Sequence, residues 1–181
     1  AYEVLLDGLE SADDDPDYVK LLAETAFRSN ATEEAVAHLE LYRSIVADDP
    51  EQLASLARRY AEWDFNLAAL EVLSDIRETV DEDPELLFLE AKLYLLQTPE
   101  FDRGYDLLQA ALETGFEDTE ALASVLDELP EGEREILRAL YEEFEISLPE
   151  NGGETVNGSD TDLGEDAETE SAAEADSVQS E

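Results

Sequence analysis

Residues 48–84 read DDPEQLASLARRYAEWDFNLAALEVLSDIRETVDEDP. Apolar side chains recur in the first half of this stretch at intervals of three and four residues: Leu53, Leu56, Ala57 and Tyr60. This is the spacing of one buried face of a helix. Pro50 and Pro84 bound the stretch and Asp64 interrupts it, so it is predicted to form two helices, 51–62 and 66–80.

The same spacing continues on both sides, and no segment alternates with period two for long enough to form a strand. Breaking and capping residues divide the pattern into pieces of helical length. The predicted class is therefore all-α. The predicted helices are 1–11, 17–29, 32–47, 51–62, 66–80, 85–97, 101–114, 118–128 and 131–146.

Three independent series of residues share a spacing of 34. These are Pro16, Pro50 and Pro84; Ala1, Ala35 and Ala69; and Leu5, Leu39 and Leu73. A fixed period of this length indicates a repeated pair of helices that buries its apolar face by stacking on its neighbours. Small residues stand where paired helices would cross and would allow their axes to approach: Ala23, Ala57, Ala91, Ala35, Ala69 and Gly104.

A 34-residue unit of two helices resembles the tetratricopeptide repeat. The second unit follows that family's pattern best, and the first and third follow it in part: Val19, Leu22, Ala23 and Ala26, then Leu87, Ala91 and Tyr94. The resemblance implies an antiparallel helix-pair solenoid with a right-handed superhelix over residues 1–148. Its parts are a half repeat at 1–16, repeats at 17–50, 51–84 and 85–117, and a closing helix pair at 118–148.

The chain departs from the family pattern at identifiable places. Glu90 stands where the family has leucine, which predicts a weakened packing contact. The prolines fall three residues late, which predicts longer loops between repeats. Because residues 1–11 align with the second helix of a unit, we expect a fragment that begins in the middle of a repeat.

Charge is the dominant feature of the composition. The 181 residues carry 50 acidic and 10 basic side chains, for a net charge of −40. Residues 149–181 contain 11 acidic residues, no basic residue and no aromatic residue, which predicts a disordered acidic tail. Residues 1–148 keep a net charge of −29, so nucleic acid is not an expected partner. No apolar run is long enough to predict insertion into a membrane.

No motif predicts catalysis, a cofactor or a metal. The chain has no cysteine and one histidine, His38, which is expected on the surface because no second histidine or cysteine is available to join it. The acidic clusters 13–17 and 160–166 lack the spacing of a calcium loop. The protein is therefore expected not to be an enzyme.

The few basic residues are unevenly placed. In tetratricopeptide proteins the first helix of each repeat lines a concave groove, and the resemblance implies partner-binding residues on that face: Lys20, Phe27, Arg28, Arg58, Phe88, Lys92 and Leu95. Arg58 and Lys92 are equivalent, 34 residues apart, and predict a short positive ladder. Ion pairs at a spacing of four residues, Lys20–Glu24, Glu24–Arg28 and Arg58–Glu62, are the alternative for these bases. Phe88 and Leu95 could instead pack against the closing helices.

Three functional hypotheses follow. The first is a non-enzymatic scaffold that holds a partner peptide or helix in the groove, where a free carboxylate on the partner would find positive charge. The second is an acidic chaperone for basic clients, in which the surface and the tail supply charge complementarity. The third reads the acidity as adaptation to high salt.

Overall fold

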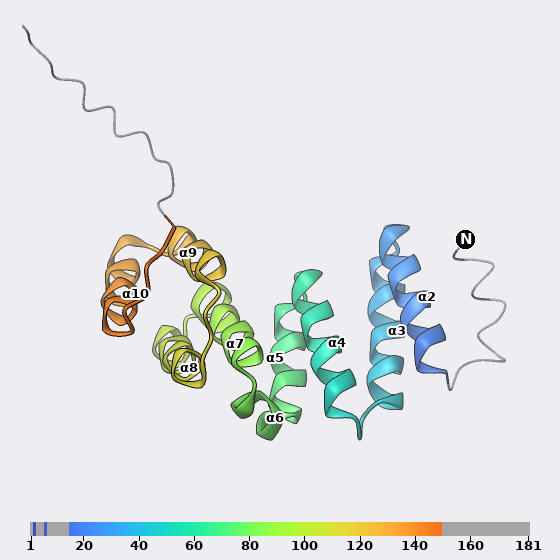
Figure 1. The fold of residues 1–181 in the computed structure, drawn as a ribbon. Helices are drawn as coiled ribbons and strands as arrows, with labels where there is room; N and C mark the ends of the chain where they lie inside the picture. The colour runs from blue at the N-terminus through green and yellow to red at the C-terminus, as the bar shows by residue number, and fades with distance from the viewer. Residues whose placement is uncertain (1, 3–5, 7–14, 150–181) are drawn as a thin grey trace, which may run out of the picture. The chain divides into compact units, whose positions relative to one another are not determined.

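The computed structural model describes residues 2, 6 and 15–149. Over this part the chain is all-α, as predicted, and has no strand. The helices shown in Figure 1 are α2 (Pro16–Arg28), α3 (Thr32–Ile45), α4 (Pro50–Glu62), α5 (Asn66–Asp75), α6 (Arg77–Glu82), α7 (Pro84–Gln97), α8 (Phe101–Thr114), α9 (Thr119–Glu128) and α10 (Glu131–Glu143). Except for Tyr2, Leu6 and Pro149, the predicted helix 1–11 and the predicted tail 149–181 lie outside the described residues.

An Asp-Pro pair begins the first helix of each repeat. The carboxylates of Asp15, Asp49 and Asp83 accept hydrogen bonds from backbone N–H groups two or three residues later, at 2.9–3.3 Å. The proline that follows each of them is the first helical residue, where its missing N–H costs nothing. The prolines therefore start the first helix of each pair.

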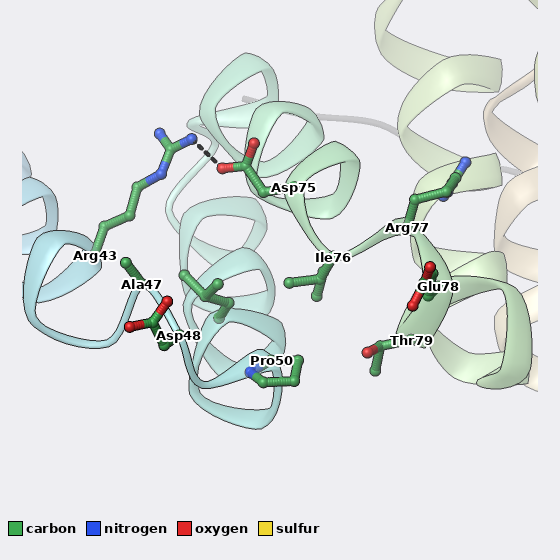
Figure 2. A pocket seen from close by; sticks show the side chains of 10 residues that line it. Arg43, Ala47, Asp48, Pro50, Asp75, Ile76, Arg77, Glu78 and Thr79 are labelled. Carbon is green, nitrogen blue, oxygen red and sulfur yellow. Dashed lines mark hydrogen bonds and ion pairs between the residues drawn. The ribbon is translucent and has the colours of Figure 1, made fainter.

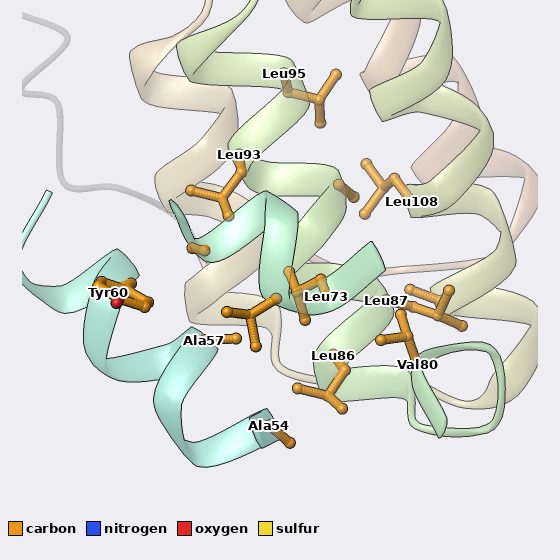
Figure 3. Packing of buried hydrophobic residues seen from close by; sticks show 14 of the residues in the cluster. Ala54, Ala57, Tyr60, Leu73, Val80, Leu86, Leu87, Leu93, Leu95 and Leu108 are labelled. Atoms are coloured by element: carbon orange, nitrogen blue, oxygen red, sulfur yellow. The ribbon is translucent and has the colours of Figure 1, made fainter. Parts of the chain in front are cut away.

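Helices pack most closely within three pairs, α2 with α3, α4 with α5 and α7 with α8. Neighbouring pairs also touch, through α3 and α4, α5 and α7, and α7 and α9. Figure 3 shows apolar side chains of α4 to α8 meeting in one core, with Ala57, Leu73 and Leu86 near its centre. The core is continuous across the pairs, as expected of helices that cannot bury their apolar faces alone.

The predicted helix 66–80 is wrong in one respect, because it is broken at Ile76. This residue has φ −108° and ψ 33°, and a new helix, α6, begins at Arg77. Ile76 and Val80 are buried at the break, so tertiary packing, and no glycine or proline, sets this change of direction. The spacing of apolar residues in the sequence does not predict that Val80 belongs to a separate helix.

The turns inside the first two pairs are equivalent. Asn30 and Asp64, 34 residues apart, have φ of 60° and 62°, in the left-handed region that asparagine and aspartate tolerate better than most residues. The next residue in each turn donates its backbone N–H back to the helix, Ala31 to the Ala26 carbonyl and Phe65 to the Tyr60 carbonyl. The two turns are thus a matched pair for mutagenesis.

A rise in melting temperature is expected when NaCl is raised from about 0.05 M to about 1 M. The charge of −29 on residues 1–148 repels itself, and screening shortens the Debye length from about 10 Å at 0.1 M to about 3 Å at 1 M. Thermal unfolding followed by circular dichroism measures the midpoint at each salt concentration. A midpoint that stays constant or falls with salt would contradict the prediction.

Candidate partner-binding groove

A groove of about 430 Å³ lies between α4 and α7 and is lined by both members of the predicted ladder, Arg58 and Lys92. Ala61, Leu89 and Leu96 supply its apolar wall. Three carboxylates also line it: Glu62, Asp64 and Glu128. The groove therefore offers two cations and an apolar surface surrounded by negative charge.

The two cations differ in whether they already have an ion-pair partner in the described part of the chain. Arg58 is about half exposed, at 46%, and its Nη2 lies 3.6 Å from the Asp83 carboxylate. Lys92 makes no ion pair or hydrogen bond with any residue that the structure describes. The expected Arg58–Glu62 pair is absent, because Glu62 binds Arg59 at 3.0 Å. Lys92 is consequently the cation best able to receive a ligand carboxylate.

Lys20, Phe27 and Arg28 lie on α2, away from this groove. Glu24 pairs with Arg28 at 3.2 Å, as expected, and with Arg59 at 3.0 Å, so the expected Lys20–Glu24 pair is not formed. Lys20 has no partner within the described residues.

Phe27 is held by aromatic packing between repeats. Its ring stacks on Trp63, with centroids 4.0 Å apart and planes 2° from parallel. The Arg59 guanidinium lies 5.7 Å from the centre of the Trp63 ring. Phe27 thus joins α2 to the end of α4, a contact that the sequence analysis did not anticipate.

Phe88 and Leu95 are packing residues in α7. Phe88 stacks on Phe116 with centroids 4.1 Å apart, and Leu95 is only 5% exposed against Gly104 of α8. The side chain of Leu95 is not exposed on the predicted binding face, because the close approach of α8 covers it. These contacts are not with the closing helices 118–148, since Phe116 precedes α9 and Gly104 belongs to α8.

Two polar side chains, those of His38 and Glu90, are buried. His38 is 8% exposed, and its Nε2 lies 2.9 Å from the Tyr2 hydroxyl, so the expected surface position was wrong. Burial lowers the pKa of His38, and the nearby charge of Glu34, which raises this pKa, offsets only part of that effect. Glu90 is 1% exposed in α7 and binds Arg77 through both carboxylate oxygens.

A second cavity, of about 490 Å³, lies between the end of α3 and the break between α5 and α6 (Figure 2). Its two cations are already committed, Arg43 to Asp75 at 2.6 Å and Arg77 to Glu90. Figure 2 shows Arg43 joined to Asp75 at the cavity edge, with Ile76 between Asp75 and Arg77. This cavity is larger than the groove but offers a ligand no free cation.

Neither metal sites nor membrane spans are found in the part of the chain that the structure describes. No group of three or more histidine, aspartate and glutamate side chains there could hold a metal ion. No helix there has the length and apolar character needed to cross a bilayer. Comparison with protein-family models, with curated proteins and with solved structures gives no match for this chain.

Proposed function

We propose that this chain is a non-enzymatic helical-repeat scaffold of the tetratricopeptide type, and that its α4–α7 groove binds a segment of a partner protein. The 34-residue period and the close packing of adjacent helix pairs support a right-handed solenoid. The single observation that carries the binding proposal is Lys92, a cation without a partner among the described residues, which lies with Arg58 in a partly apolar groove of a protein with net charge −40.

The groove chemistry defines what it binds. A partner carboxylate, from aspartate, glutamate or a chain terminus, is placed between Lys92 and Arg58. An apolar side chain next to that carboxylate covers Leu89 and Leu96. The charged contact supplies orientation and the apolar contact supplies buried area.

Lys92→Glu is expected to weaken peptide binding about tenfold, which corresponds to about 1.4 kcal/mol. The reversal places a carboxylate against the partner's carboxylate, while the fold loses no described contact. Peptides are first selected on the full chain from a displayed random library, and the strongest binder is then titrated by fluorescence anisotropy.

Arg138→Glu is the matched control. Arg138 is exposed on α10, far from the groove residues in sequence, and its replacement by glutamate changes the net charge by the same amount as Lys92→Glu. We expect it to alter affinity less than about twofold, in the range of a screened surface charge. Equal losses in the two variants would point to a general charge effect, and no loss in Lys92→Glu would remove the groove as the binding surface.

A second candidate function, an acidic escort for basic client proteins, is favoured by one observation, the surplus of 40 negative charges. An escort of this kind binds through its overall field and not through one groove. It predicts that any reversal of a basic residue to glutamate, at any place on the surface, strengthens the binding of a basic client by a similar factor.

A further inference from the structure

The groove continues into a second pocket that differs from it in chemistry. This pocket, of about 480 Å³, lies where the α4–α5 turn faces the end of α7. The two pockets share three lining residues, Asp64, Asn66 and Gln97. A peptide lying in the groove can therefore pass directly over Asp64 into the second pocket.

The second pocket presents an unusually exposed apolar surface. Leu67 is 73% exposed, the largest value among the large apolar residues of the described chain, and it lies beside Phe65 and Leu70. Within the fold this leucine covers no core, since it stands at the second residue of α5 and faces outward. In the isolated protein the Leu67 side chain is in contact with water. An apolar side chain of a partner that covered it would gain the free energy of burying this surface.

Asp64 and the end of α7, at Gln97 and Thr98, line this pocket together with Leu67. The Asp64 carboxylate makes no ion pair or hydrogen bond within residues 15–149. Pro99 has no N–H to give to the Leu95 carbonyl, and the Glu100 N–H goes to the Thr98 hydroxyl at 3.1 Å instead of to the Leu96 carbonyl. The last turn of α7 thus keeps free carbonyl groups at the negative end of the helix dipole.

We propose that the surface formed by Asp64, Leu67 and the end of α7 binds a basic residue of the partner segment together with a following apolar residue. The arginine or lysine lies at Asp64 and the free α7 carbonyls, and the apolar side chain covers Leu67. The inference rests on the proposed function for the presence of a partner segment in the adjoining groove. The partner motif is then a carboxylate with an apolar residue, followed by a basic residue with a second apolar residue.

The negative charge of the chain supports this choice of occupant. A segment that carries only acidic residues would meet −40 charges on approach, whereas an added basic residue is attracted by the same field. Lys92 and Asp64 then bind opposite ends of one mixed-charge segment, which fixes its direction along the surface.

The test uses the full chain and the strongest peptide from the displayed library, synthesised with a fluorescent label. Asp64→Gly combined with Leu67→Ala removes the carboxylate and the apolar contact. Glycine accepts the φ of 62° at position 64 without strain, and Leu67 is exposed, so the variant should fold as the parent does. The control is Asn30→Gly with Leu21→Ala, which makes the same backbone change in the equivalent turn and truncates an exposed leucine of α2, without changing the net charge.

The expected result is a loss of at least tenfold in affinity for Asp64→Gly/Leu67→Ala and less than twofold for the control, together with a basic residue recurring in the selected peptides. Unchanged affinity in this variant while Lys92→Glu weakens binding would overturn this inference and leave the groove in place. Loss in this variant with none in Lys92→Glu would support the second pocket and reject the groove. Failure to select any peptide above background would reject both.

Discussion

Arg77→Ala is expected to lower the free energy of unfolding by about 3 kcal/mol. The reason is Glu90, which is 1% exposed in the middle of α7 and whose carboxylate is bound by Arg77 at both oxygens. Removing the partner of a buried charge leaves it without water and without compensation. Arg103 remains at 3.8 Å and keeps the loss at the lower end of the range for buried pairs.

Arg43→Ala is the matched control, because Arg43 stands 34 residues before Arg77, at the equivalent place in the preceding repeat. Its partners Glu40, Glu71 and Asp75 are all more than half exposed. Exposed pairs contribute little, so this replacement should cost less than about 1 kcal/mol. The two arginines differ chiefly in the burial of the carboxylate that they bind.

Urea unfolding followed by circular dichroism gives both values, and a third variant separates charge from packing. Glu90→Leu replaces the buried carboxylate by an apolar side chain, and leaves Arg77 and Arg103 exposed enough to be hydrated. We expect its stability to lie within about 1 kcal/mol of the parent, and Arg77→Ala should cost little in that background. Equal losses for Arg43→Ala and Arg77→Ala would show that water reaches Glu90.

Gly104→Val is expected to lower the free energy of unfolding by about 3 kcal/mol. A Cβ atom at this position would lie 2.7 Å from Cγ of Leu95 and 2.9 Å from the Leu95 backbone nitrogen. A side chain can turn away from such an overlap, but the backbone of α7 can yield only if the two helices separate. The better helix propensity of valine, less than about 1 kcal/mol, does not offset this overlap.

Gly132→Val provides the comparison, since a Cβ at position 132 of α10 meets no atom within 4 Å. This replacement should change stability by less than about 0.5 kcal/mol, as expected of an exposed helical site. Thermal and urea unfolding of both variants measure the difference. A Gly104→Val protein as stable as the Gly132→Val protein would mean that α7 and α8 can move apart freely.

The candidate groove was only partly predictable from sequence. The period of 34 placed Arg58 and Lys92 on equivalent turns, and both do line one groove. The same reasoning assigned Leu95 to that face, where it is buried, and it missed Asp64 and Leu67. The period predicts which residues occupy equivalent positions, but the exposure of each residue depends on the helix that packs against it. Leu95 is buried because α8 packs against it at Gly104.

The sequence by itself determined where α2, α4 and α7 begin. The carboxylates of Asp15, Asp49 and Asp83 accept hydrogen bonds from backbone N–H groups only two or three residues later. Each of these helix caps therefore depends on neighbouring residues alone. Tertiary structure alone decided the break at Ile76, the burial of His38 and Glu90, and the stacking of Phe27 on Trp63. These features depend on contacts between side chains that are far apart in the sequence. Arg77 and Glu90 are 13 residues apart and Tyr2 and His38 are 36 residues apart, so each pair meets only after the helices have packed.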